Sequence, residues 1–200
     1  MLFAKLKEQI KLIAETSYYG AMEALFNAIG ASFKPSIFCV VNLRNRGSGI
    51  PDGGLFTENQ QNVSIDSAGF AQLPAHGAIE AKPTSQDITA LANSEQVKKY
   101  IVLYGQVLAT NFYQFVLVTR APDGSAVIEE SYKLAESEIE FWQEVMTPRR
   151  LADRHATALN EYLLRVMRRQ APLADPRDVA WILASYAREP GHDWKAAVSI

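Results

Sequence analysis

The 200-residue sequence predicts an α/β fold in which helices flank a mixed central sheet. Helix-like and strand-like segments follow one another in the order helix, three strands, helix, two strands over the first two thirds of the chain. After about residue 145 the pattern becomes helical, which predicts a C-terminal helical appendage. We therefore expect two parts: an α/β domain at residues 1–144 and a helical linker or appendage at residues 145–200.

The first half of the chain supplies a helix and three strands. Apolar residues recur at helical spacing from 2 to 29, and Gly30 provides a stop signal. Runs rich in β-branched and aromatic residues, or otherwise apolar, predict strands. The expected strands are 36–44, 54–57 and 77–82. A glycine-rich turn at 45–54 precedes the second strand, and the polar residues 58–74 predict a loop or excursion before the third.

The second half continues with a segment that starts at Pro83, becomes helical by Ser94 and ends at Gly105. Two further strands are expected at 106–111 and 114–120, joined by a tight turn. The run 125–135 has the composition of an additional edge strand. Two later helices are expected, each opening with a cap residue followed by proline. These openings are Thr147–Pro148, which starts a helix over 148–170, and Asp175–Pro176.

Composition excludes several classes of protein. A net charge of −2 argues against a strongly basic nucleic-acid coat protein, although it allows a local basic cleft. The single Cys39 excludes a disulfide framework and a cysteine-based metal site. No apolar run approaches the ~18 residues of a membrane span, and the N-terminus has no continuous apolar stretch typical of a signal peptide. We therefore expect a cytoplasmic protein without a membrane partner.

Two charges interrupt the apolar third strand. Glu80 and Lys82 in "GAIEAKP" are two residues apart, so both side chains point to the same face of the strand. Asp52 in "IPDGG" stands at the turn before the preceding strand. Carboxylates on neighbouring strands can share a Mg²⁺ ion, or Mn²⁺, and the Ala81 backbone carbonyl can supply another oxygen ligand. Lys82 could then position the attacking water or stabilise developing charge during phosphodiester hydrolysis.

The helix after this strand carries two more candidates. Gln96 and Tyr100 in "SEQVKKY" are one helical turn apart and share a face. They could support the site, but an ordinary amphipathic surface would give the same spacing. The Glu80–Lys82 pair likewise has an alternative interpretation as an ion pair on a surface strand. The apolar residues around the pair favour a functional interpretation, because burying charges is costly unless they are paired or bind metal.

Together these residues resemble the PD-(D/E)xK nucleases that carry a QxxxY element after the lysine strand. The segments "GIPDGGLF", "AIEAKP", "SEQVKKY" and "VLATNFYQFVLV" resemble the N-terminal nuclease region of large restriction–modification or adenine-specific DNA methyltransferase proteins. The resemblance implies a restriction-endonuclease-like core and Mg²⁺-dependent cleavage of double-stranded DNA. It also implies downstream methyltransferase and target-recognition domains. S-adenosylmethionine would bind only there, since this chain has no methyltransferase catalytic motif.

The resemblance adds Glu15, an acid of the first helix, as a supporting residue of the metal site. It also raises the possibility that a second copy of the protein takes part in double-strand cleavage. The long excursion at 58–76 departs from the short hairpin of many relatives and could displace Asp52. An alternative function is a catalytically silent nuclease fold that binds DNA or a partner beside a methyltransferase, and a further one is a repair or recombination nuclease. Basic residues that could contact the DNA backbone, or simply be solvated, are Lys98, Lys99, Arg149 and Arg150.

Overall fold

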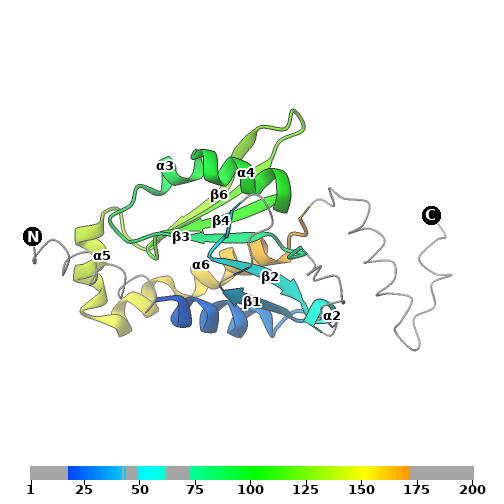
Figure 1. Cartoon of the computed structure of the whole chain (residues 1–200). Coiled ribbons are helices and arrows are strands. Elements are labelled where there is room, and N and C mark those ends of the chain that lie inside the picture. The colour runs from blue at the N-terminus through cyan, green and yellow to red at the C-terminus, as the bar shows by residue number, and fades with distance from the viewer. Residues whose placement is uncertain (1–17, 42, 44–48, 62–72, 172–200) are drawn as a thin grey trace, which may run out of the picture.

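The computed structural model describes residues 18–41, 43, 49–61 and 73–171. The six described strands form one mixed sheet in which the spatial order follows the sequence order (Figure 1). Strands β3 and β4 pair in parallel, and every other neighbouring pair is antiparallel. The strands are β1 (Ile37–Val41), β2 (Gly53–Thr57), β3 (Ala78–Ala81), β4 (Gln106–Thr110), β5 (Gln114–Arg120) and β6 (Ala126–Lys133). The predicted α/β class with a mixed sheet is confirmed.

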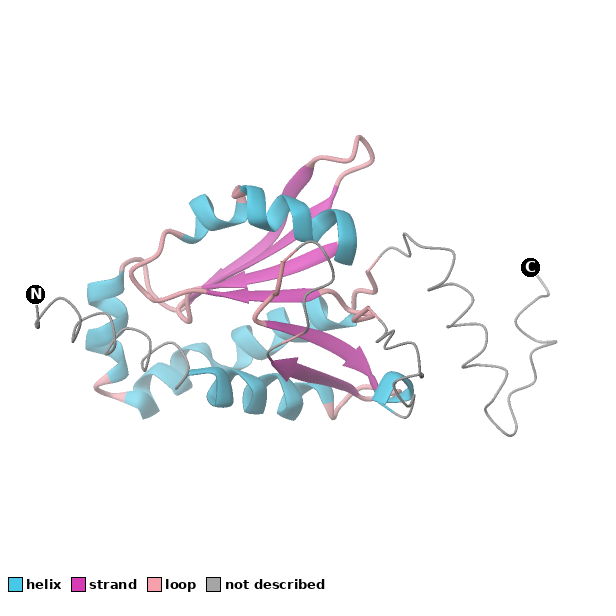
Figure 2. Ribbon diagram, viewed as in Figure 1, coloured by secondary structure: helices cyan, strands magenta, loops and turns pink. Residues whose placement is uncertain are grey.

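Helices cover both faces of this sheet (Figures 1 and 2). Residues 18–30 are helical, and the later helices are α2 (Glu58–Gln61), α3 (Ile88–Ala92), α4 (Glu95–Tyr104), α5 (Glu138–Val145) and α6 (Pro148–Arg168). Side-chain alternation divides the core into two layers. Leu108 of β4 packs toward helix 18–30 and α6, whereas its neighbours Val107 and Ala109 pack toward α3 and α4.

The boundaries of α4 follow from its end residues. The Ser94 side chain accepts a hydrogen bond from the Val97 amide, and Gly105 ends the helix with φ 74°. Both residues were predicted. The separate helix α3 was not predicted as a helix; it begins where the Asp87 carboxylate accepts hydrogen bonds from the amides of Thr89 and Ala90.

The helix that the sequence assigned to an appendage is part of the sheet domain. The four most buried residues of α6 share one core with Phe26 of the first helix and Ile79 of β3. They are Tyr162, Leu163, Val166 and Met167, each no more than 1% exposed. The prediction of an appendage starting at 145 is therefore wrong for the described residues, because amphipathic spacing reveals an apolar face but not what covers it. The predicted helix after Asp175 lies outside the described residues.

The end of α6 is held beside the start of β3. The buried His76 ring lies 2.9 Å from the Arg169 carbonyl through Nδ1, and the Gln106 amide donates to the same carbonyl at 3.0 Å. Thr147 does precede α6, as predicted, but its side chain makes no cap hydrogen bond to the helix. Its hydroxyl donates instead to the Glu144 carbonyl at 3.3 Å. None of the helices in the described part is long and apolar enough to cross a membrane.

Candidate functional site

The predicted acid–x–lysine pair lies on one face of β3, as strand alternation requires. Ile79 and Ala81 pack into the core beneath helix 18–30 and α6, so Glu80 and Lys82 face the side covered by α3 and α4. The Lys82 ammonium lies 2.5 Å from Glu80 Oε1. Glu80 is 1% exposed, whereas the Lys82 side chain is 30% exposed. The pair therefore joins a buried carboxylate to an ammonium that reaches solvent.

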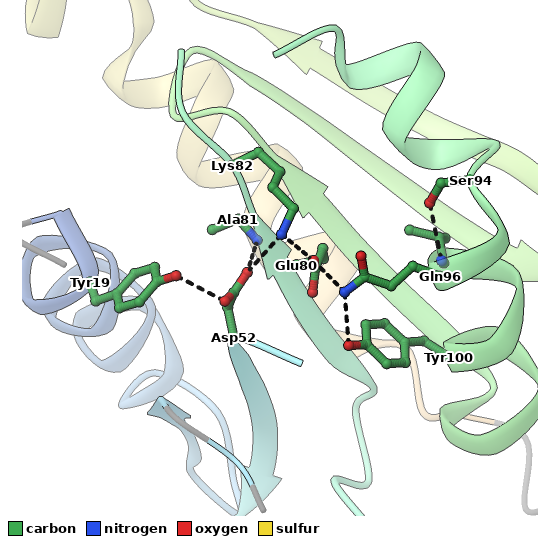
Figure 3. A network of polar contacts seen from close by, with 9 residues as sticks. Tyr19, Asp52, Glu80, Ala81, Lys82, Ser94, Gln96 and Tyr100 are labelled. Carbon is green, nitrogen blue, oxygen red and sulfur yellow. Dashed lines mark hydrogen bonds and ion pairs between the residues drawn. The ribbon is translucent and has the colours of Figure 1, made fainter. Parts of the chain in front are cut away.

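Asp52 lies beside this pair (Figure 3). Strands β2 and β3 pair with Gly53 opposite Ile79, so Asp52, the residue before Gly53, stands at the end of the hairpin that carries Glu80 and Lys82. Asp52 Oδ2 lies 3.9 Å from the Lys82 ammonium. Both predicted carboxylates thus approach the same ammonium group.

The excursion between β2 and β3 does not displace Asp52. It leaves β2 after Thr57 and returns to β3 at Ala78, and these two residues lie at the far ends of their strands from Asp52 and Lys82. Because β2 and β3 are antiparallel, the connection joins the strand ends that lie away from Asp52 and Lys82. We expected that this excursion could displace Asp52, but Asp52 lies within hydrogen-bonding distance of the Ala81 amide.

The backbone of Ala81 faces Asp52. The Ala81 amide donates to Asp52 Oδ2 at 2.8 Å, while the next amide, that of Lys82, donates to the Thr110 carbonyl of β4 at 2.9 Å. In a ladder, the amide and carbonyl of one residue point to the same neighbouring strand. The Ala81 carbonyl, which was predicted as an oxygen ligand, consequently points toward the β2 side, where Asp52 lies.

Gln96 and Tyr100 complete the network from α4. The Gln96 amide donates to Glu80 Oε1 and to the Tyr100 hydroxyl, both at 3.0 Å. The two residues share one face of α4, as predicted, and the structure places that face next to Glu80. Tyr100 is fully buried, and this burial raises its pKa. Gln96 therefore links the buried Glu80 carboxylate to a neutral phenol.

Glu80 has an unusual environment for a carboxylate. Burial, and secondarily the nearby Asp52 charge, raise its pKa to about 7 even though Lys82 acts in the opposite direction. Its second oxygen, Oε2, is buried without a hydrogen-bond partner among the described residues. A buried carboxylate oxygen without a donor is costly unless something else neutralises it, and a cation would do so.

Two contributors to this site were not predicted. The Tyr19 hydroxyl, from helix 18–30, donates to Asp52 Oδ1 at 2.8 Å. Gly49 has φ +107°, and a Cβ placed on it would lie 3.1 Å from the Tyr100 hydroxyl. Tyr19 lies in the first predicted helix and Gly49 in the predicted glycine-rich turn, and neither was predicted to contact the site. No local signal in the sequence identifies either contact.

The structure places none of the remaining predicted residues that it describes in the network. Glu15 is beyond the described residues. Lys98 is exposed and forms an ion pair with Glu95 at 2.7 Å, and Lys99 is exposed on the same helix. Arg149 and Arg150 are exposed in the first turn of α6, which covers the opposite face of the sheet from α4. Their contact with DNA remains a prediction.

The site as described therefore combines two carboxylates, one ammonium, an amide and a phenol. Over the ranges that the structure describes, no group of three or more His, Cys, Asp or Glu side chains is placed to hold a metal ion. Two carboxylates and the backbone carbonyl of Ala81 supply oxygen ligands of the kind that Mg²⁺ prefers, with water completing its shell. Comparisons with family models, with curated proteins and with solved structures found no match for this chain.

Proposed function

We propose that this chain is a Mg²⁺-dependent endonuclease that hydrolyses phosphodiester bonds of double-stranded DNA, with a restriction-endonuclease-like core. The observation that carries the proposal is the convergence of Asp52 and Glu80, from neighbouring strands, on the ammonium of Lys82. A surface ion pair does not account for this arrangement, because Glu80 is 1% exposed and lies beside a second acid. The resemblance of the surrounding sequence segments to PD-(D/E)xK nucleases supports the same function.

The residues present fit a bound divalent ion. Glu80 Oε2 is buried without a donor in the described part of the chain, and a cation bound between the two carboxylates would neutralise it, while Asp52 is partly exposed to solvent. Asp52, Glu80 and the Ala81 carbonyl would hold Mg²⁺, with Mn²⁺ as a substitute. When bound, such an ion polarises the phosphate and lowers the pKa of a coordinated water.

Side chains of this chain perform the remaining tasks. Lys82, with its side chain 30% exposed, is placed to orient the attacking water or to stabilise negative charge on the phosphate. Gln96 fixes the Glu80 carboxylate from α4, and Tyr100 fixes Gln96 in turn. Burial of Glu80 and Tyr100 strengthens the electrostatic interactions at their end of the network relative to water.

The biological setting follows from the resemblance. We propose that this chain is the cleavage domain of a cytoplasmic restriction–modification protein, with methyltransferase and target-recognition domains downstream that bind S-adenosylmethionine and read the DNA sequence. A second copy would supply the cut in the other strand. Contacts of Lys98, Lys99, Arg149 and Arg150 with phosphates would position the duplex.

Cleavage of a supercoiled plasmid tests the proposal. The wild-type chain should nick or linearise the plasmid with Mg²⁺ or Mn²⁺ but not with EDTA. Asp52→Asn and Lys82→Met should each reduce the rate at least about a hundredfold, because each removes a group that acts on the reacting phosphate or water. Glu95→Gln, which changes an exposed acid on α4, serves as the matched control and should keep the wild-type rate.

The outcomes also separate the proposal from its alternative. Cleavage that survives both substitutions would place the activity elsewhere and overturn the assignment of the site. A wild-type chain that binds DNA but does not cleave it with either metal would instead favour the catalytically silent module. The binding measurement uses a short duplex and fluorescence anisotropy.

A further inference from the structure

Asp52 lies in a bend rather than within a strand. Strand β2 begins one residue later, and its first two residues, Gly53 and Gly54, have no side chains that could pack beside the carboxylate. A carboxylate at such a position takes its orientation from the groups that hydrogen-bond to it. The Ala81 amide holds Oδ2 and the Tyr19 hydroxyl holds Oδ1, each at 2.8 Å (Figure 3).

Tyr19 donates from a helix that is fixed against the sheet. Met22, Phe26 and Ile29 of this helix are 5%, 0% and 8% exposed and belong to the core beneath β1 to β5. A Cβ added to Gly30 would lie 1.8 Å from the Ile37 carbonyl oxygen, so the helix end and β1 are in close backbone contact. Tyr19 itself is partly buried against this core, so packing leaves little freedom for the part of the helix that carries it.

The bond from Tyr19 to Asp52 joins a neutral donor to a carboxylate. Hydrogen bonds to charged groups are stronger than those between neutral groups, and they fix geometry as well as energy. The two Asp52 oxygens are thus held from two different elements, the first helix and β3. Loss of either donor would let the carboxylate rotate away from the Glu80–Lys82 pair.

We propose that Tyr19 is a positioning residue of the candidate site: it holds Asp52 in the orientation that faces Glu80 and Lys82, and it thereby sets the affinity of the site for a divalent ion. The part that concerns the ion rests on the proposed function. The part that concerns Asp52 orientation depends only on the geometry of the metal-free protein.

The test replaces Tyr19 by Phe, which keeps the ring and removes the hydroxyl. Tyr18→Phe is the matched control, because the Tyr18 ring packs against Phe112 with centroids 4.9 Å apart and the variant keeps that ring. Exchange of the Ala81 amide hydrogen, followed by NMR on the full chain without metal, reports whether Asp52 still accepts from it. We expect exchange about tenfold faster in Tyr19→Phe and unchanged in Tyr18→Phe.

A second readout measures the site itself. Titration with Mn²⁺ followed by calorimetry should show affinity about tenfold weaker in Tyr19→Phe, and cleavage should recover toward the wild-type maximum at high metal concentration. A general folding defect would lower the maximum instead. Unchanged Ala81 exchange and unchanged Mn²⁺ affinity would overturn the proposal. If the wild type neither binds Mn²⁺ nor cleaves DNA, the proposed function fails, while Ala81 exchange still decides the role of Tyr19 in holding Asp52.

Discussion

Lys82 Nζ lies 2.5 Å from Glu80 Oε1, two residues away on the same face of β3. The ammonium reaches solvent while the carboxylate is almost fully buried. Burial and the Asp52 charge raise the pKa of Glu80 to about 7 despite this contact. In the metal-free protein, Glu80 therefore changes charge near neutral pH.

Folding stability should depend on the ionisation of Glu80. The unfolded chain releases this proton near the ordinary pKa of 4.5, whereas the folded protein keeps it up to about 7, so stability falls as the pH rises between these values. The fall is about 3 kcal/mol if the full shift applies. Urea unfolding of the wild type and Glu80→Gln at pH 5 and pH 8, with EDTA present, measures it.

The wild type should lose stability relative to Glu80→Gln on going from pH 5 to pH 8. Glu95→Gln, on the exposed surface of α4, should follow the wild type. Parallel pH dependence of the wild type and Glu80→Gln would show that the pKa of Glu80 is not raised by folding.

Because α6 packs into the core, a substitution near its C-terminal end should lower the free energy of unfolding strongly. Met167 is 0% exposed, and Met167→Ala should lower the free energy of unfolding by about 2–5 kcal/mol. Met146, 81% exposed between α5 and α6, is the matched control, and Met146→Ala should change stability by less than about 0.5 kcal/mol. Chemical denaturation measures both variants. If both variants changed the free energy of unfolding by the same small amount, α6 would not be part of the core and the prediction of a separate appendage would stand.

Substitution of Gly49 should reduce cleavage by more than the strain of its positive φ alone would cause. Gly49 and Gly124 both have positive φ, at +107° and +87°, so alanine strains the backbone at either position by about 1–2 kcal/mol. Only at Gly49 would the new Cβ meet the Tyr100 hydroxyl, at 3.1 Å; at Gly124 the nearest atom is an Arg120 side-chain nitrogen at 3.7 Å. We expect Gly49→Ala to reduce plasmid cleavage at least about tenfold and Gly124→Ala to preserve it. Equal activity of the two variants would mean that Gly49 does not bear on the site.

Local patterns in the sequence predicted the parts of the site that depend on periodicity. Side chains alternate along a strand, so Glu80 and Lys82 lie on one face of β3. Residues four apart share a face of a helix, so Gln96 and Tyr100 lie together on α4. The antiparallel direction of β2 and β3 then brings Asp52 to the end of β3 that carries Glu80 and Lys82, whatever the length of the connection between the other strand ends. These relationships need only the secondary structure and the order of the strands.

The contacts that were not predicted join elements far apart in the chain. Tyr19 meets Asp52 because helix 18–30 packs under β1 and β2, and the helical pattern does not show which residue will lie beside the turn. The burial of α6 against β3 and β4 is equally a property of the assembled sheet. Thr147 has the residue type of a cap, yet its φ of −125° and ψ of 68° are accompanied by no side-chain bond to the helix.

Divalent-metal binding tests the central claim most directly. Calorimetric titration of the wild-type chain with Mn²⁺ should show binding at one site that is lost in both Asp52→Asn and Glu80→Gln and kept in Glu95→Gln. This result follows if Asp52 and Glu80, which approach the same ammonium, hold one ion between them. Binding that persists unchanged in both site variants, or a wild-type chain that binds no Mn²⁺, would contradict the account.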